Sequence, residues 1–492
     1  MSKQSWDALD QEDLARLRDK KLRRQVRFQL YAYSPFYRRV FDQAELRAEG
    51  FNGLADLQKV PTIGRSILAE DPEGFVLNPE RSLIQRWGSG SQLAELAMDT
   101  LLRGVEHADD LLKNEYQTVH VLETTGTTGE PIPVSLSRRD LAVLATQGRR
   151  ALEVAGVGKT DVVLNLMEPS SAGGFWPLWL GGVALGIKQN APGFLEPQQA
   201  AALASKMKAS VVLGTGEDVL EMLEVGLRLE SLRKVVLGPQ STGPVLRRRI
   251  QERSSGVQVI ATYGFAEGRS IWAECAAANG ALDSGFHLSG DLDLFEVISP
   301  RSGKAVKAGD PGELHFTGLD QRGTALMRYR PGDVAMGGLR TGRCPYCGRM
   351  TDRIIGPIRR AENLLEIQPA GSEALAIDVE MLADVLSHPG LANWQVEVGK
   401  SDGEPRGPDE LYVLFEPRSN VDASALVVDL DQSFRSEIGF SPTQFVLSDR
   451  AKGGVVDLRP ILVNGQPNST IGGEETPLVR LWRTPVPQER DE

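Results

Sequence analysis

The feature that most constrains the fold is a regular alternation of short apolar runs with helical runs between residues 137 and 261. Ser137 and Asp140 have the spacing of a capping box that would begin the first helix. The sequence predicts helices at 137–155, 198–207, 218–226 and 245–253, and strands at 162–167, 183–187, 211–213, 235–237 and 257–261. This alternation favours a parallel or mixed sheet with helices on both faces, which binds ligands at the carboxyl ends of its strands.

A turn rich in glycine and threonine lies just before this region, between two stretches that favour strands. It reads Thr124-Thr125-Gly126-Thr127-Thr128-Gly129. Backbone N–H groups and hydroxyls in such a turn can all point at one anion, and phosphate is the usual one. No Gly-Lys-Ser/Thr follows, so the turn is not a Walker motif. Taken alone, the pattern leaves both an ordinary turn and a phosphate-binding loop open.

Two later stretches carry residues that can contact a nucleotide. Tyr263 comes just after the strand predicted at 257–261, and an aromatic ring at a strand end, followed by Gly264, can stack on a flat base. Glu267 can hold a divalent metal ion. Asp333 follows a Pro-Gly turn and can accept hydrogen bonds from a ribose diol. A core tyrosine, a solvated glutamate and a turn aspartate are the alternative interpretations.

Composition narrows the class of protein. A chain of 492 residues is too long for one ordinary domain, so we expect two or three. A net charge of −11 argues against a surface for nucleic acid or an anionic membrane. The start of the chain lacks an apolar signal region, and no run approaches the roughly 18 apolar residues of a membrane span. We therefore expect a cytoplasmic protein that binds neither nucleic acid nor membrane.

In this order and spacing, the three stretches resemble motifs of the adenylate-forming enzymes, the superfamily of the acyl-CoA synthetases. The threonine turn resembles their phosphate loop. Residues 263–267 resemble their Tyr-Gly-x-Thr-Glu motif, with Ala266 in the threonine position, and residues 329–333 resemble their Tyr-Arg-Thr-Gly-Asp motif. The finer resemblance is to phenylacetate–CoA ligases, and it rests on residues 34–37, 60–62, 173–186 and 312–314. It covers roughly residues 30–460.

The resemblance implies an α/β fold in two parts. A large N-terminal adenylation domain, residues 1–358, would have mixed sheets flanked by helices. A small α+β lid domain would follow at residues 359–460, and residues 461–492 would form a C-terminal extension. Within the lid, the sequence predicts a helix at 377–386, strands at 394–398 and 411–415, and a broken helix at 423–438.

The resemblance also implies an activity. The enzyme would use ATP and Mg²⁺ to activate a carboxylic acid, aryl or short acyl, and would pass the acyl group from its adenylate to coenzyme A. The implied catalytic residues are Glu267, which would hold Mg²⁺, Thr128 and Lys452. The implied nucleotide-binding residues are Thr124, Thr125, Gly126, Thr127, Gly129, Gly238, Pro239, Gln240, Tyr263, Gly264, Asp333 and Arg353. The implied acyl pocket consists of Gly173, Gly174, Phe175 and Trp176.

The match to the family weakens in the lid. The family's hinge acid aligns best with Glu362 after a three-residue insertion, whereas an ungapped alignment puts Arg359 there. Lys452 is the only candidate for the late lysine motif, and it is offset by one residue. An amine, a carrier protein or another small nucleophile therefore stays open as the acceptor. A zinc-stapled nucleotide-binding protein without catalysis is a third hypothesis, and a homodimer is one assembly that we consider.

All three cysteines belong to one further pattern. Cys344 and Cys347 form a Cys-x-x-Cys pair, and Cys275 and His287 precede it. Three cysteines and one histidine make a closed tetrahedral zinc set, and some members of the family have a similar arrangement. Such a zinc ion would be structural. Reduced buried cysteines beside a surface histidine, or a redox pair, are the alternatives.

Overall fold

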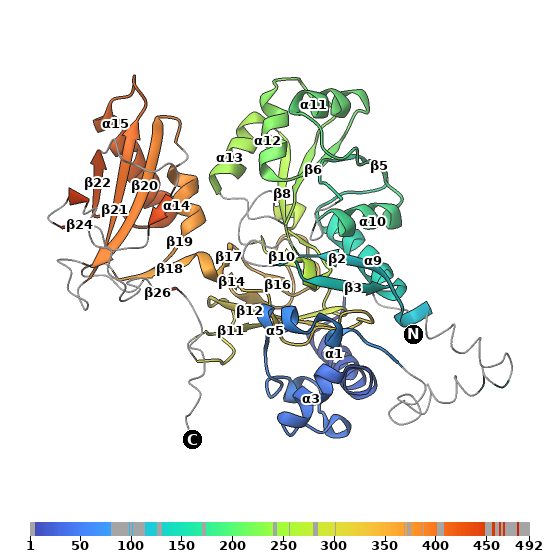
Figure 1. Ribbon diagram of the computed structural model, residues 1–492. Coiled ribbons are helices and arrows are strands. Elements are labelled where there is room, and N and C mark those ends of the chain that lie inside the picture. Colours follow the sequence, from blue (N-terminus) through green and yellow to red (C-terminus); the bar gives the residue numbers. More distant parts are fainter. Residues whose placement is uncertain are drawn as a thin grey trace. The chain divides into compact units, whose positions relative to one another are not determined.

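The structure is a computed structural model of the chain (Figure 1). It describes residues 5–79, 98, 101, 114–124, 130–169, 174–239, 244–254, 256–278, 284–300, 302–368, 370, 375–386, 388–400, 408–447, 455–457, 462–463, 466–467 and 480–481. The chain divides into two compact units. The first comprises Met1–Thr242, Arg249–Ser299 and Gly303–Ile358, and the second comprises Gly243–Arg248, Pro300–Ser302 and Arg359–Glu492.

The first unit contains the predicted parallel sheet, with strand order β5-β4-β6-β7-β8-β9. Its strands are β4 (Val162–Asn165), β5 (Lys188–Asn190), β6 (Val211–Gly214), β7 (Lys234–Leu237), β8 (Gln258–Tyr263) and β9 (Trp272–Ala273). The first five run parallel, and β9 pairs antiparallel with β8. The helices between them are α10 (Phe175–Leu185), α11 (Pro197–Lys206), α12 (Gly216–Glu224) and α13 (Pro244–Arg253), of which α13 enters this unit only at Arg249. The predicted mixed α/β class is confirmed.

Helix α9 (Arg138–Val154) begins with the predicted capping box, in which Ser137 and Asp140 bond reciprocally. It crosses α10 closely, because a Cβ on Gly148 would lie 1.7 Å from the carbonyl oxygen of Pro177. The prediction of a strand at residues 183–187 is wrong. These residues end α10, Gly186 caps it with a φ of +73°, and the strand begins at Lys188. A short apolar run in a helix cannot be told from a strand by its pattern, and here it does not mark burial either, since Val183 is exposed.

A second sheet of the first unit has strand order β1-β13-β12-β14-β17, with β11 paired to β12. Its strands are β1 (Ile63–Gly64), β11 (Asp293–Ile298), β12 (Gly312–Gly318), β13 (Tyr329–Arg330), β14 (Asp333–Ala335) and β17 (Ile358–Arg360), the last of which ends beyond this unit. β1 pairs parallel with β13, so the N-terminal segment lies beside the second half of the unit. Smaller sheets are the hairpin of β2 (Thr118–Glu123) and β3 (Pro133–Ser137), and a sheet of β10 (Phe286–His287), β15 (Leu339–Arg340) and β16 (Arg353–Ile354).

N-terminal helices pack on the second sheet. They are α1 (Gln11–Gln25), the π-helical turn Val26–Leu30, α2 (Tyr31–Tyr33), α3 (Pro35–Gln43), α4 (Leu54–Leu57) and α5 (Arg65–Glu70). Leu22, Phe41 and Tyr37 share one core with Phe316 and Tyr329. The Tyr37 hydroxyl also donates to the carbonyl of Ala325 at 2.9 Å. This burial fixes the segment that leads into α5, which begins at Arg65.

The second unit has its own core around a sheet of order β22-β21-β20-β23. Its strands are β20 (Leu391–Lys400), β21 (Asp409–Pro417), β22 (Gln444–Leu447) and β23 (Val455–Asp457), with short strands β18 (Leu364–Ile367), β19 (Leu375–Asp378), β24 (Leu462–Val463), β25 (Gln466–Pro467) and β26 (Arg480–Leu481). Helix α14 is Val379–Leu386. The predicted broken helix is confirmed, because α15 (Ala423–Ser433) continues as a π-helical turn, Phe434–Ile438. A further boundary at residue 460 stays a prediction.

Among the described residues, no helix has the length and hydropathy that a membrane crossing needs.

One buried acid of the first unit makes the stability of the protein depend on pH. Asp293 is 1% exposed, and its carboxylate accepts hydrogen bonds from the Trp272 indole at 2.9 Å and the Gln147 amide at 2.8 Å. Burial raises the pKa of Asp293 to about 7. The folded protein therefore keeps this proton at pH values where the unfolded chain loses it.

We expect Asp293→Asn to gain stability relative to the unmodified protein as the pH rises from about 4 to about 7. The gain should be about 1.4 kcal/mol per pH unit. In this pH range the unfolded unmodified chain loses the Asp293 proton while the folded protein keeps it, which favours unfolding, and asparagine has no such proton to lose. Above about pH 7 the difference should be constant. Urea denaturation at a series of pH values measures it, with the exposed Asp310→Asn as the control. Parallel stability curves for Asp293→Asn and the unmodified protein would contradict a neutral buried acid.

Candidate active site and metal centre

Glu267 lies at the meeting point of three segments that are distant in the sequence. It follows β8 on the single turn Ala266–Gly268 and is 5% exposed. The Tyr329 hydroxyl donates to its Oε1 at 2.9 Å. Burial raises the pKa of Tyr329, and the negative charge of the neighbouring Glu267 raises it further. Arg65 Nη1 pairs with the same Oε1 at 3.0 Å. Arg65 Nη2 donates to Thr124 Oγ1 at 2.9 Å. One guanidinium therefore joins the start of the threonine turn to the predicted metal-binding carboxylate.

Thr124 pairs with Ile132 at the end of the β2–β3 hairpin that leads into the threonine turn. Its N–H donates to the carbonyl of Ile132 at 3.1 Å, and its hydroxyl accepts from the N–H of Ile132 at 2.9 Å. The rest of the predicted phosphate loop, Thr125, Gly126, Thr127, Thr128 and Gly129, lies outside the described residues.

The residues predicted for the base and the ribose are neighbours. The Tyr263 hydroxyl donates to Asp333 Oδ2 at 2.7 Å, and both residues are buried. The ring of Tyr263 stacks on Trp272, with centroids 5.5 Å apart and an interplanar angle of 30°. Asp333 begins β14, next to the turn that contains Gly332 at a φ of +84°. Gly264 directly follows β8.

Part of the predicted acyl pocket lies beside the predicted base-binding strand end. A Cβ on Gly174 would lie 2.9 Å from Pro239 Cδ, so this glycine permits a close approach to the turn after β7, where Gly238 lies. Phe175 is buried and stacks on Trp179 at 6.0 Å. Trp176 packs edge-on against His120 of β2 at 4.9 Å. Gly173 and Gln240 lie outside the described residues.

The residues predicted for hinge and lysine are less completely described. Arg359 is 7% exposed, and its Nε pairs with Asp378 Oδ2 at 3.0 Å. Glu362 lies in the single turn Ala361–Asn363, but its side chain is outside the described part of the chain. Lys452 is likewise outside it. Arg353 of β16 is buried, and its Nη1 donates to the carbonyl of Ser284 at 2.9 Å. The choice of hinge residue therefore stays open.

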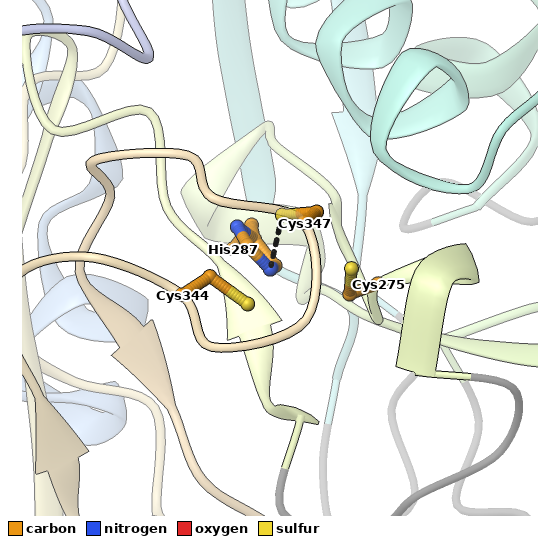
Figure 2. A group of neighbouring side chains, drawn as sticks. All are labelled: Cys275, His287, Cys344 and Cys347. Atoms are coloured by element: carbon orange, nitrogen blue, oxygen red, sulfur yellow. Dashed lines mark hydrogen bonds between the residues drawn. The ribbon is translucent and has the colours of Figure 1, made fainter.

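Cys275, His287, Cys344 and Cys347 lie together, as their pattern predicts. One ligand atom from each lies within 4.8 Å of all the others, and Figure 2 shows the side chains converging. Cys275 follows β9, His287 belongs to β10, and the Cys-x-x-Cys pair lies in the turn after β15. The cluster therefore ties the chain segment after Glu267 to two later segments.

The pKa values of the cluster differ among its members: those of Cys344 and Cys347 are lowered, whereas the hydrogen bond with Cys347 raises the pKa of Cys275 and that of His287 is also raised. His287 Nδ1 lies 2.7 Å from Thr351 Oγ1, which leaves Nε2 facing the sulfurs, 3.9 Å from Cys347 Sγ. The pKa of Cys347 is lowered, chiefly by its hydrogen bond with Cys275. The pKa of Cys344 is also lowered, because hydrogen bonds from His287 and backbone groups outweigh the opposing effect of burial. Zinc sites use thiolates, and a hydrogen-bonded histidine is typical of them.

Arg65 is the residue that the motifs did not identify. In the sequence, residues 60–62 mark only a family resemblance, and none of the nucleotide-binding motifs covers the helix that follows. A basic residue at the start of that helix, five positions after Val60, was the available signal. The pairing of β1 with β13 places this helix start beside the strand of Tyr329, where Arg65 reaches Glu267.

Three comparisons relate the chain to known proteins. Residues 84–325 match the model of a family described as AMP-binding enzyme. The chain is 26% identical over 457 residues to a phenylacetate-coenzyme A ligase of Thermus thermophilus, covering 90% of this chain and 86% of the relative. It is 24% identical over 448 residues to a phenylacetate-coenzyme A ligase of Aromatoleum evansii, covering 88% of this chain and 89% of the relative.

Solved structures share the fold. A crystal structure of 2-hydroxyisobutyryl-CoA ligase in the postadenylation state, with 2-HIB-AMP bound, has a TM-score of 0.68 and 18% identity, covering 92% of this chain and 91% of that one. The same ligase in the thioesterification state, with 2-HIB-AMP and CoA, has a TM-score of 0.60 and 19% identity, at the same coverage of both chains. At these identities the likeness concerns the fold alone.

Proposed function

Because this chain belongs to the adenylate-forming superfamily of AMP-binding enzymes, we propose that it is an AMP-forming ligase that activates a carboxylic acid with ATP and transfers it to coenzyme A. One observation carries the proposal. Arg65 bonds both Thr124 and Glu267, while Tyr263 bonds Asp333. Candidate groups for phosphate, metal, base and ribose are thus linked through neighbouring segments of one unit.

The first half-reaction follows from these positions. A carboxylate oxygen attacks the α-phosphorus of ATP, and pyrophosphate leaves. Thr124 and loop residues 125–129 would hold the β- and γ-phosphates through hydroxyl and N–H groups. Asp333 would accept hydrogen bonds from the ribose, and Tyr263 with residues 238–240 would enclose the base. Lys452 would offset negative charge where the carboxylate approaches the α-phosphate.

Glu267 is the proposed Mg²⁺ ligand. Its carboxylate is a hard oxygen donor of the kind that Mg²⁺ prefers, and its buried position gives it a defined direction. A bound Mg²⁺ supplies Lewis-acid polarisation of phosphate oxygens and a template for their geometry. Oε1 accepts from Tyr329 and Arg65, so these two side chains set where the carboxylate points.

Arg65 is a further phosphate-site residue in this proposal. It is the cation between the threonine turn and Glu267, and its side chain is 34% exposed, so it can reach a ligand at the turn. We expect Arg65→Ala to raise the KM for ATP about tenfold, as the loss of one charge-assisted hydrogen bond would. Arg65→Lys should recover part of it, because lysine keeps the charge but not the fork. Steady-state kinetics measure the effect. An unchanged KM in Arg65→Ala would place the arginine outside phosphate binding.

The donor set at Cys275, His287, Cys344 and Cys347 fits a structural zinc ion. Three sulfurs and one imidazole nitrogen fill a tetrahedral shell and leave no open position. We therefore assign this cluster no part in the reaction steps. Its role would be to hold the segment that carries Tyr263, Glu267 and β9 against the later segments that provide His287 and the Cys-x-x-Cys turn.

The acceptor and the acid define the test. The two curated relatives described above are phenylacetate-CoA ligases, which supports an aryl acid and coenzyme A. Pyrophosphate–ATP exchange with a panel of aryl and short acyl acids tests adenylation. Product analysis with coenzyme A against amines or a carrier protein then identifies the acceptor. Exchange without any thioester would favour another acceptor, and ATP binding without exchange would favour the non-catalytic hypothesis.

A cytoplasmic location, a homodimer and the lack of nucleic-acid binding stay predictions.

A further inference from the structure

A buried ion pair lies directly behind the proposed metal-binding turn. Arg269 comes two residues after Glu267 and is 5% exposed. Its Nη1 lies 3.1 Å from Asp140 Oδ1 and 3.5 Å from the carbonyl oxygen of Ser135. Both side chains of the pair are almost fully buried, with 4% exposure for arginine and 3% for aspartate. No step of the proposed reaction uses either of them.

The backbone of Arg269 is held in an unusual conformation. Its φ of +51° is in the left-handed region, which favours glycine over residues with a Cβ. Arg269 caps the turn Ala266–Gly268, and its N–H donates to the carbonyl of Ala266 at 3.1 Å. A bulky residue persists in this conformation only when its surroundings hold it there. The side chain pairing with Asp140 is such a restraint, and it acts on the turn that carries Glu267.

Asp140 connects this turn to two other parts of the site. Its carboxylate accepts from the N–H and hydroxyl of Ser137, at 2.9 and 2.8 Å, where β3 leads into α9 (Figure 1). It also accepts from the N–H groups of Gly323, at 2.7 Å, and Arg322, at 3.0 Å. β3 follows the threonine turn, and Gly323 precedes the strand that contains Tyr329. One carboxylate therefore contacts the chain after the first two proposed nucleotide-binding segments and before the third.

We infer that Asp140 and Arg269 are positioning residues that hold the Glu267 carboxylate in register with the threonine turn. The inference rests on the proposed function, since it concerns the proposed magnesium ligand. Neither residue would touch the nucleotide or the acid. Their effect would pass through the direction of Glu267, so it should appear in Mg²⁺-dependent binding of ATP and be absent when Mg²⁺ is removed. A merely structural pair would lower stability without that dependence.

The test is ATP binding by isothermal titration calorimetry over a range of Mg²⁺ concentrations, which requires no knowledge of the acid. In Arg269→Gln, the Mg²⁺ concentration that gives half of the maximal ATP affinity should rise about tenfold, the usual effect of losing a residue that orients a metal ligand. ATP affinity in excess EDTA should match that of the unmodified protein. Asp140→Asn should change in the same direction. The double variant should lose less than the product of the two single losses, because both act through one contact.

Arg150→Gln is the matched control. Arg150 lies on α9, as Asp140 does, and its largely buried side chain pairs at 2.6 Å with Asp291 rather than with a residue of the Glu267 turn. Its Mg²⁺ dependence should equal that of the unmodified protein. The inference is overturned if Arg269→Gln and Arg150→Gln behave alike. If Arg269→Gln fails to fold, Asp140→Asn decides in its place, and an unshifted Mg²⁺ dependence there counts equally against the inference. An unmodified protein that does not bind ATP with Mg²⁺ would instead refute the proposed function.

Discussion

Glu267→Gln is expected to lower the rate of carboxylate-dependent pyrophosphate–ATP exchange about a thousandfold. Glutamine has nearly the same shape and can still accept from Tyr329, but it lacks the charge that a magnesium ligand needs. Stabilisation of the phosphate charge by a correctly held metal ion is worth several kcal/mol, and about 4 kcal/mol corresponds to this loss. The loss should appear in the maximal rate at saturating acid, and added Mg²⁺ should restore only part of it.

Glu274→Gln is the matched control for this experiment. Glu274 is also buried, lies seven residues further on, and accepts from the N–H of Ala261 at 3.0 Å, which glutamine can still do. It has no proposed contact with nucleotide or metal, so its exchange rate should stay within a few-fold of the unmodified protein. If Glu267→Gln keeps an exchange rate within a few-fold of the unmodified protein, as Glu274→Gln should, Glu267 is not a ligand of the metal ion. If both variants lose the exchange activity to the same extent, the cause is a general effect of altering buried acids in this segment.

The sequence predicted the elements that depend on local signals. The capping box at Ser137 and Asp140 and the β-branched runs of β6 and β7 are such signals, and the structure has these elements within a few residues of the predicted bounds. The prediction for residues 183–187 failed because α10 is apolar on its exposed side as well, where Val183 is 59% exposed, so the helix shows no amphipathic period. The local pattern therefore located most of the elements, but it could not separate a strand from a short apolar helix.

The candidate site was predicted only where the family has a motif. Glu267, Tyr263 and Asp333 belong to motifs, and the bond between Tyr263 and Asp333 joins two of them. Arg65 and Arg269 belong to none. The role of Arg65 depends on the pairing of β1 with β13, and that of Arg269 on a left-handed backbone and a distant aspartate. Contacts between residues so far apart in sequence leave no periodic or compositional signal.

Cys344→Ser is expected to release the proposed zinc ion and to cause the largest loss of stability of any substitution considered for this protein. The purified unmodified protein should contain one zinc per chain by mass spectrometry of the metal, and the variant close to none. Serine is a poor zinc ligand, and removal of one donor opens the tetrahedral shell. Loss of a structural metal belongs to the class of changes that cost about 4 kcal/mol or more. In a unit of this size, that should lower the melting temperature by roughly 5 °C.

The effect should reach the nucleotide site, because Cys275 lies eight residues after Glu267 and directly follows the segment that pairs with β8. ATP affinity should therefore fall together with zinc content when the unmodified protein is treated with a chelator, and it should return when zinc is added back. Pro345→Ala is the matched control, since it alters the same turn and keeps all four ligands. If Cys344→Ser melts at the same temperature as Pro345→Ala, the four side chains hold no structural ion. The same conclusion follows if the unmodified protein is isolated without metal and is as stable as it is with added zinc.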